Sequence, residues 1–217
     1  MREGTKTTDQ LSQPEEGYVN DTADRDLQYV TMAIRGEPQA FEMLVRRHQK
    51  RMFNIAYRMT GNYDDAADIV QESFLSAYKA IRKFRGDARF STWLYGIVVN
   101  HSRNRIRAAN TRSFHEPLSL DEDLSRVDGH ILHFDPPSPD VPVVDALVRK
   151  ETQEKVQKCI NQLDKDHREI LVLRDIQGFS YEEIIEMLGV PEGTVKSRLS
   201  RARSAIKDIL NKTFGDL

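Results

Sequence analysis

The chain has 217 residues, of which 39% are hydrophobic and 30% are charged, and its formal net charge is -2. This length suits one large or two small domains, and the single cysteine, Cys159, excludes a disulfide framework within the chain. No apolar run approaches the ~20 residues that a membrane-spanning helix needs, and the chain does not open on a signal-peptide pattern. We therefore expect a cytoplasmic protein without membrane insertion.

The spacing of apolar residues predicts an all-α fold of two small helical domains joined by an extended acidic linker. Apolar side chains recur at steps of three and four, and few stretches alternate as strands do. Residues 1–24 are polar and are expected to form a disordered N-terminal extension. The first domain is predicted over residues 25–111, beginning with a short helix over residues 25–35 and a longer one over residues 39–60.

The third predicted helix, residues 64–83, has two distinct faces. One face is apolar at helical spacing and is expected to be buried: Ala67, Val70, Phe74, Ala77 and Ile81. The other face mixes polar with aliphatic residues: Asp68, Ile69, Glu72, Leu75 and Ser76. Carboxylates around exposed aliphatic side chains suit a docking surface for a basic partner. An ordinary solvated helix face is the alternative, and the pattern leaves both open.

Basic and aromatic residues gather in a loop over residues 84–90 and in the helix predicted over residues 91–109. Four aromatic residues crowd their junction: Phe84, Phe90, Trp93 and Tyr95. Beyond Asp87 both segments carry arginines and no acid. This combination suits single-stranded nucleic acid, because bases stack on aromatic rings while cations follow the backbone. The alternative is that these rings belong to the core, where we expect most of Trp93.

Residues 112–145 are rich in acid and proline. From residue 113 onward they hold eight Asp or Glu and one basic residue, Arg126, whereas residues 40–110 hold thirteen Lys or Arg against six Asp or Glu. Such a segment is predicted to be an extended linker that marks a domain boundary. Three histidines are scattered in it without the spacing of a metal site: His115, His130 and His133. We expect neither a metal nor another cofactor.

The second domain is predicted over residues 146–217. Helices over residues 145–161 and 164–176 lead into a helix-turn-helix motif over residues 180–205. Ser180 and Glu183 have the spacing of a capping box for its first helix. Gly189 ends that helix, and Pro191 stands at the start of the next.

The second helix of this motif has an apolar stripe and a basic side. The stripe is expected to be buried: Val195, Leu199, Ala202 and Ile206. Between Gly193 and Lys207 the helix carries five Lys or Arg and no acid. A helix with basic and small polar side chains fits the major groove of DNA. A helical hairpin with a solvated charged face is the alternative.

Two ordered blocks of this sequence resemble the extracytoplasmic-function (ECF) group of bacterial sigma factors, the compact two-domain members of the sigma-70 family. Region two is recognised in AFEMLVRRHQKRMFNIAYRM, DDAADIVQESFLSAYKAI and KFRGDARFSTWLYGIVVN. Region four is recognised in INQLDKDHREILVLRDIQGFSYEEIIEMLGVPEGTVKSRLSRAR. The resemblance covers residues 27–212, and the acidic linker replaces the third domain of larger members.

The resemblance implies a sigma factor whose partners are core RNA polymerase, promoter DNA and an anti-sigma factor. It implies that the polymerase is bound by Asp68, Gln71 and Glu72. It implies that a flipped base and the displaced strand of the minus-ten element are held by Ala80, Phe84, Arg85, Gly86, Asp87, Asn100, Arg103, Asn104 and Arg107, with Arg105 as a further strand contact. It implies that the minus-thirty-five element is read by Lys196, Ser197, Ser200, Arg201 and Arg203.

Two other functions remain as alternatives. A one-component helix-turn-helix regulator would carry a ligand pocket in its first domain and bind DNA without a polymerase. An enzyme acting on nucleic acid would need a cluster of carboxylates or histidines for metal-assisted hydrolysis. The acids of this chain fall in the linker or singly on helix faces, so we expect no enzymatic activity.

Overall fold

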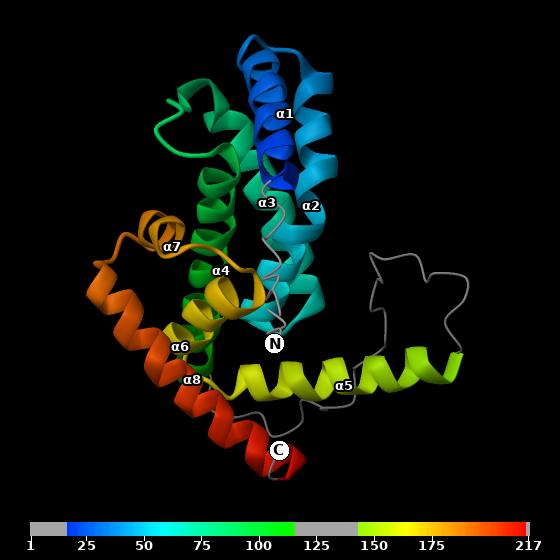
Figure 1. Ribbon diagram of the computed structural model, residues 1–217, viewed down its shortest axis with the longest axis vertical. Coiled ribbons are helices and arrows are strands. Elements are labelled where there is room, and N and C mark those ends of the chain that lie inside the picture. Colours follow the sequence, from blue (N-terminus) through cyan, green and yellow to red (C-terminus); the bar gives the residue numbers. More distant parts are fainter. Residues whose placement is uncertain (1–16, 116–142, 216–217) are drawn as a thin grey trace, which may run out of the picture.

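A computed structural model describes residues 17–115 and 143–215, with the side chains of residues 26–111 and 151–215. Every regular element in these ranges is helical, which confirms the expected all-α fold. The first block contains α1 (Gly17–Ile34), α2 (Pro38–Thr60), α3 (Tyr63–Ala80) and α4 (Phe90–His115). The second block contains α5 (Val143–Asn161), α6 (Lys165–Leu171), α7 (Tyr181–Leu188) and α8 (Glu192–Phe214), as Figure 1 shows.

Gly61 and Asn62 set the turn between α2 and α3. Gly61 ends α2 with left-handed backbone, φ 73°, and its N–H donates to the Tyr57 carbonyl at 2.8 Å. A side chain would strain this conformation, which glycine adopts freely. Asn62 then begins α3, because its side-chain oxygen accepts from the Asp65 N–H at 2.9 Å. Two adjacent residues therefore end one helix and cap the next.

The helix-turn-helix motif is formed by α7 and α8, as the sequence predicts. The Ser180 hydroxyl accepts from the Glu183 N–H at 3.1 Å, and the Glu183 carboxylate accepts from the Ser180 N–H at 2.8 Å. Gly189 ends α7 with φ 65°. The expected stripe of α8 is buried at Val195, Leu199 and Ala202, while Ile206 is half-buried. The capping box, the turn and the stripe are thus confirmed.

The buried face of α3 differs from the expected one. Its buried residues are Ala66, Ile69, Ser73 and Ala77. Ala67 is exposed, and Val70 and Phe74 are half-buried. The reason is that α3 packs against both α2 and α4. Small side chains face these two helices because they let the helices approach closely, and the larger side chains lie at the edge of the contact. Ile69, expected on the polar face, belongs to the core.

Three helices also differ from expectation in their bounds or their packing. α1 begins at Gly17 rather than at residue 25, because residues 18–24 contain neither proline nor glycine to stop it. The helix predicted over residues 164–176 ends at Leu171 and continues as a π-helical turn, Val172–Ile176. α4 extends to His115, beyond the expected end near residue 109, and Trp93 on it is partly buried and packs against the core, as expected.

The two blocks pack against each other and share one hydrophobic core. α5 and α6 contact α2, and α7 lies beside α4 (Figure 1). This interface, with α2 and α4 on one side and α5, α6, α7 and the Val172–Ile176 turn on the other, is called the seam below. Gly96 of α4 admits a close neighbour there, since a Cβ on it would lie 3.9 Å from the Cα of Met187.

Two expected segments fall outside the described residues. These are most of the N-terminal extension and most of the acidic linker, including the side chains of His115, His130 and His133. In the described part of the chain, the helices are too short or too polar to cross a membrane.

Candidate nucleic-acid interface

α3 presents an acidic face that also exposes large apolar side chains. The Asp68 and Glu72 side chains are 61% and 56% exposed, and Gln71 is exposed beside them. Leu75 and Tyr78 are 52% and 53% exposed. Exposed apolar side chains rimmed by carboxylates are typical of a protein-binding surface. The structure therefore brings the three residues expected to bind polymerase onto one accessible face.

This acidic face is connected to the neighbouring basic helix. Arg105 of α4 lies 3.0 Å from the Asp65 carboxylate and 3.5 Å from that of Asp68. His101 of α4 lies 3.5 Å from the Glu72 carboxylate. Arg105, expected as a strand contact, is thus engaged by acids of α3.

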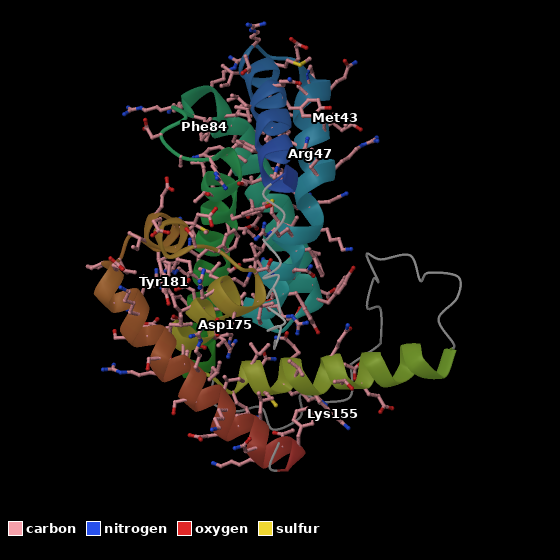
Figure 2. The ribbon with its side chains drawn as sticks, viewed as in Figure 1. Met43, Arg47, Phe84, Lys155, Asp175 and Tyr181 are labelled. Carbon is pink, nitrogen blue, oxygen red and sulfur yellow. The ribbon has the colours of Figure 1, made fainter. Side chains whose placement is uncertain are left out.

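The loop of residues 84–89 displays an aromatic cluster at the start of α4. The Phe84 ring centroid lies 5.8 Å from that of Phe90 and 5.2 Å from that of Trp93, and Figure 2 marks Phe84 in this loop. Phe84 and Trp93 are half-buried, so both keep part of their rings accessible. The structure exposes Arg85, Gly86 and Asp87 beside them and leaves Ala80 half-buried.

The polar and basic residues of α4 differ in whether they are exposed or bound to the second block. Asn100, Asn104 and Arg107 are exposed. Arg103 donates two hydrogen bonds to the Glu169 carboxylate of α6, at 2.6 and 2.7 Å. Of the residues expected to contact the minus-ten element, Arg103 is therefore held by the second block.

α8 exposes the residues expected to read DNA. Ser200 and Arg201 are exposed, and the Ser197 hydroxyl donates to the Thr194 carbonyl at 3.1 Å. Lys196 pairs with Glu192 at 2.6 Å. Arg203 donates to both oxygens of Asp175, at 2.9 and 2.6 Å.

Two cationic side chains lie over the ring of Tyr181, the first residue of α7, beside α8. Arg174 lies over the Tyr181 ring at 4.8 Å from its centroid, and Lys196 lies at 6.0 Å. Figure 2 places Tyr181 near the junction of α7 and α8. This stacking was not predicted, because no local spacing links residue 174 to Tyr181.

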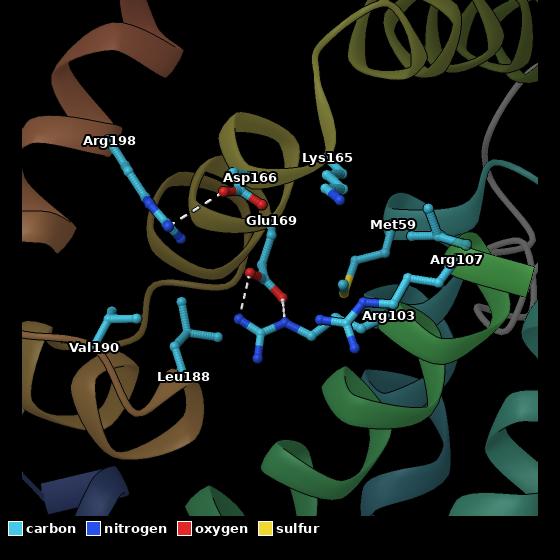
Figure 3. A pocket seen from close by; sticks show the side chains of 10 residues that line it. Met59, Arg103, Arg107, Lys165, Asp166, Glu169, Leu188, Val190 and Arg198 are labelled. Atoms are coloured by element: carbon cyan, nitrogen blue, oxygen red, sulfur yellow. Dashed lines mark hydrogen bonds and ion pairs between the residues drawn. The ribbon is translucent and has the colours of Figure 1, made fainter. Parts of the chain in front are cut away.

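Glu169 was also missed, and it lies at the centre of the seam. Its side chain is 4% exposed, and that of Arg103 is 24% exposed. Burial raises the pKa of Glu169, while Arg103 acts in the opposite direction. The pair lines a cavity of about 390 Å³ together with Arg107 of α4, Lys165 of α6 and Arg198 of α8 (Figure 3).

A buried polar chain crosses the first block. His48 Nε2 lies 3.0 Å from the Asp26 carboxylate of α1, and His48 Nδ1 lies 2.7 Å from the Tyr95 hydroxyl of α4. Burial is the main cause that raises the pKa of Tyr95 to about 12. The Tyr95 ring continues to Phe179 of the second block, 5.5 Å away between centroids. These contacts join helices and need no ligand to explain them.

Metal chemistry has no candidate site in the part of the chain that the structure describes. No three histidine, cysteine or acidic side chains come together there as metal ligands do.

Two family models match the chain, one in each block. The model for Sigma-70 region 2 matches residues 44–112, and the model for Sigma-70, region 4 matches residues 153–206. The first match contains the α3 face, the aromatic loop and most of α4. The second contains Glu169 and the residues of α8 discussed above.

Curated relatives match over almost their whole length. The RNA polymerase sigma-H factor of Pseudomonas aeruginosa is 36% identical over 190 residues, which cover 87% of this chain and 95% of the relative. The ECF RNA polymerase sigma-E factor of Haemophilus influenzae is 35% identical over 185 residues, which cover 84% of this chain and 94% of the relative.

Solved structures have a similar fold. CnrH in complex with the cytosolic domain of CnrY has 25% sequence identity and a TM-score of 0.61, with 88% of this chain and 98% of that chain covered. The sigma factor RpoE in complex with the anti-sigma factor NepR from Bartonella quintana has 23% identity and a TM-score of 0.59, with 79% and 96% covered. At its level of identity, the second likeness shows the fold alone.

Proposed function

The chain belongs to the extracytoplasmic-function group of the sigma-70 family and is an RNA polymerase sigma factor, and from this premise we propose which residues perform each step. It binds core RNA polymerase, directs it to promoters and promotes transcription initiation. The observation that carries this conclusion is a 36% identical sigma factor matched over 95% of its length. A one-component regulator is not favoured, because the same relatives also account for the first block.

We propose region two over residues 25–111 and region four over residues 146–217, with the acidic linker over residues 112–145 between them. In this division the polymerase docks on α3 through Asp68, Gln71 and Glu72. Support comes from their exposure and from the accessible Leu75 side chain, which adds apolar contact area. In the free protein, Arg105 and His101 lie beside the acidic side chains of α3. When the polymerase binds, its basic surface takes the place of Arg105 and His101 next to these acids.

We propose that the minus-ten element is captured at the loop of residues 84–89 and along α4. Flipping a base costs a few kcal/mol of unstacking, which a shaped aromatic pocket offsets. Phe84 and Trp93 supply accessible ring area for this, and the exposed Asn100, Asn104 and Arg107 continue along the helix. Arg103 joins them once it is released from Glu169.

We propose that α8 reads the minus-thirty-five element in the major groove. Arg201 and Ser200 are exposed on it, while Lys196 and Arg203 hold carboxylates only at the surface. Exposed ion pairs contribute little to stability, so a phosphate or a base edge replaces the acid at small cost. Each good base contact is worth roughly 1–3 kcal/mol of discrimination.

We further propose where the protein acts, which partner inhibits it and what its acidic linker does. The protein has no enzymatic activity of its own and acts in the cytoplasm, where its polymerase works. An anti-sigma factor binds it and holds it inactive; the solved RpoE structure contains a different sigma factor in complex with an anti-sigma factor. The acidic linker follows the path of nucleic acid through the polymerase, because its carboxylates resemble phosphates in charge.

The function is tested by adding the purified protein to core RNA polymerase and mapping transcripts from a pool of genomic fragments. New, defined start sites are expected. Glu72→Arg is expected to weaken polymerase binding at least about tenfold, because it places a cation against a basic partner. Glu42→Arg on α2 is the matched control, since the Glu42 side chain is 58% exposed and also forms a surface ion pair. Equal polymerase affinity of the two variants would reject the docking assignment.

A further inference from the structure

We propose that the cavity of about 390 Å³ at the seam is a binding site for a small phosphate monoester that carries an apolar group. Its lining comes from α2 and α4 of the first block and from α6, α7 and α8 of the second, so the ligand contacts both blocks. The volume falls within the roughly 300–1,000 Å³ that is typical of small-molecule sites. The polymerase and promoter contacts proposed above do not involve such a ligand.

The charges that line the cavity do not balance. Four of the lining side chains are cationic and two are acidic, so two positive charges remain in excess. The cations are Arg103, Arg107, Lys165 and Arg198, and the acids are Asp166 and Glu169. A phosphate monoester carries about -1.5 to -2 charges at neutral pH. It matches this excess, whereas a neutral or cationic ligand does not.

Two of the cations are held by the two acids. Arg103 donates through Nε and a terminal nitrogen to Glu169, at 2.6 and 2.7 Å. A terminal nitrogen of Arg198 lies 3.2 Å from the Asp166 carboxylate. Each guanidinium has more N–H donors than these contacts use. The two pairs therefore fix both arginine side chains in the cavity wall and leave donors for a ligand oxygen.

The other two cations supply the unbalanced charge. Arg107 follows Arg103 by one turn of α4, and Lys165 precedes Glu169 by one turn of α6. Figure 3 shows Arg107 and Lys165 on the opposite side of Glu169 from Arg198. Both are exposed, and neither forms an ion pair with another residue that the structure describes. The phosphate group of the ligand is therefore placed between Arg107 and Lys165, because arginine and lysine bind phosphate well when no carboxylate competes.

Apolar side chains complete the lining. Leu188 of α7 and the following Val190 lie on one side of the cavity, and Met59 of α2 lies on the other (Figure 3). Ile106 of α4 also lines it. Ile106 and Val190 are half-buried and therefore keep accessible apolar surface. A ligand with an apolar group buries part of this surface, which favours binding, whereas inorganic phosphate leaves it in contact with water.

A neighbouring cavity is less suited to a phosphate. It has a volume of about 510 Å³, is lined by three cations and two acids, and shares Ile106 and Lys165 with the first. Its other cations are already engaged. Arg105 pairs with Asp65 at 3.0 Å, and Arg168 donates to three backbone carbonyls. The larger excess of positive charge therefore belongs to the first cavity.

The first test measures binding to the free full-length protein by isothermal titration calorimetry. Phenyl phosphate and AMP represent the proposed class, inorganic phosphate represents the anion alone, and adenosine represents the apolar group alone. Phenyl phosphate or AMP is expected to bind saturably below about 1 mM and to bind about tenfold or more tightly than inorganic phosphate and adenosine. Failure of both compounds to saturate the protein below about 1 mM, or equally tight binding of inorganic phosphate, would overturn the proposal.

The second test places the ligand in the cavity. Lys165→Ala is expected to weaken binding of phenyl phosphate and AMP about tenfold, because it removes one of the two unbalanced cations. Ile106→Ala is expected to reduce the advantage of phenyl phosphate over inorganic phosphate, because it removes apolar contact. Lys155→Ala on α5 is the matched control, since Lys155 is exposed and lies outside the lining. Wild-type affinity in Lys165→Ala would reject this position for the ligand.

The ligand and the melted strand compete for Arg107, and this consequence rests on the proposed function. Saturating phenyl phosphate is expected to lower run-off transcription by the wild type. Lys165→Ala lies outside the proposed DNA and polymerase contacts, so it should transcribe normally and need about tenfold more ligand for the same inhibition. Unchanged transcription by the saturated wild type would contradict the competition. Absence of transcription without ligand would count against the proposed function, whereas the calorimetric result requires neither polymerase nor DNA.

Discussion

Arg103 on α4 and Arg203 on α8 each hold a carboxylate through two hydrogen bonds of 2.6 to 2.9 Å. Their surroundings differ. Glu169 is 4% exposed and comes from the other block, whereas Asp175 is 30% exposed and lies in the same block as Arg203. Without Arg103, the Glu169 carboxylate would face other protein groups, whereas without Arg203 the Asp175 carboxylate would face water. Burial, rather than hydrogen-bond geometry, therefore decides which pair holds the molecule together and which is available for exchange with DNA.

The largest expected difference is between two aromatic rings of the second block that each receive an arginine, one from across the seam and one from within the block. Phe179 is 3% exposed beneath Arg51, and Tyr181 is half-buried beneath Arg174. Phe179→Ala is expected to lower the free energy of unfolding by about 3–5 kcal/mol, because it leaves a cavity in the core. Tyr181→Ala is expected to cost about 1 kcal/mol. Urea denaturation followed by circular dichroism measures both, and similar midpoints would contradict the distinction.

The two arginine–carboxylate pairs are compared directly by Arg103→Ala and Arg203→Ala. The first variant leaves a buried carboxylate without its counter-charge and is expected to destabilise the protein by about 3 kcal/mol. The second removes a surface pair and is expected to cost less than ~1 kcal/mol. The same denaturation experiment applies, and a larger loss in Arg203→Ala would reverse the ranking of the two sites.

The exposed side of α8 is expected to affect DNA binding rather than stability. Lys196→Ala with Arg201→Ala is expected to weaken minus-thirty-five recognition by roughly 1–3 kcal/mol for each base that is no longer read. Run-off transcription from promoters with intact and scrambled minus-thirty-five elements measures this weakening. The thermal midpoint should stay near that of the wild type. Normal discrimination between the two promoters would show that α8 is misassigned as the recognition helix.

The smallest expected effect is the pH dependence of the seam. Burial raises the pKa of Glu169 above its ordinary value, so the folded state binds this proton more tightly than the unfolded chain does. The contribution of Glu169 to the free energy of unfolding is complete at pH values below its ordinary pKa, and it is lost as the pH rises through its raised pKa. Arg103 opposes the shift, so Arg103→Ala is expected to raise this pKa further.

The stability gap between wild type and Arg103→Ala should therefore widen as pH rises from the acid range towards neutrality. Because one group titrates, this gap can change by at most about 1.4 kcal/mol per pH unit. Denaturation midpoints measured across this range test it. A gap that stays constant would mean that Glu169 does not titrate differently in the two proteins.

Features that depend on neighbouring residues could be predicted from the sequence. The Ser180–Glu183 capping box, the end of α7 at Gly189 and the stripe of α8 all involve residues within a few positions of one another. Helical periodicity and capping are local rules, and the structure follows them there. The resemblance to the ECF group likewise rested on contiguous segments, and the matched relatives confirm it.

Features that depend on the packing of distant segments could not be predicted. Arg103 and Glu169 are 66 positions apart, and Arg51 and Gln177 are 126 positions apart. No periodicity links such residues, so Arg103 was predicted only as a DNA contact and Glu169 was not singled out. The shifted buried face of α3 has the same origin, because a helix held between two neighbours buries a different arc from one held by a single neighbour.

The buried chain from Asp26 through His48 to Tyr95 shows that the unit of folding is larger than the segment of sequence similarity. The Sigma-70 region 2 match begins at residue 44, yet His48 depends on a carboxylate eighteen residues before that point. A fragment cut to the matched segment would keep an imidazole in the interior and lose its acidic neighbour, together with the Val30 side chain that packs in the same core. Fragments prepared for binding studies should therefore retain all of α1, because the similarity boundary would divide a cooperative bundle.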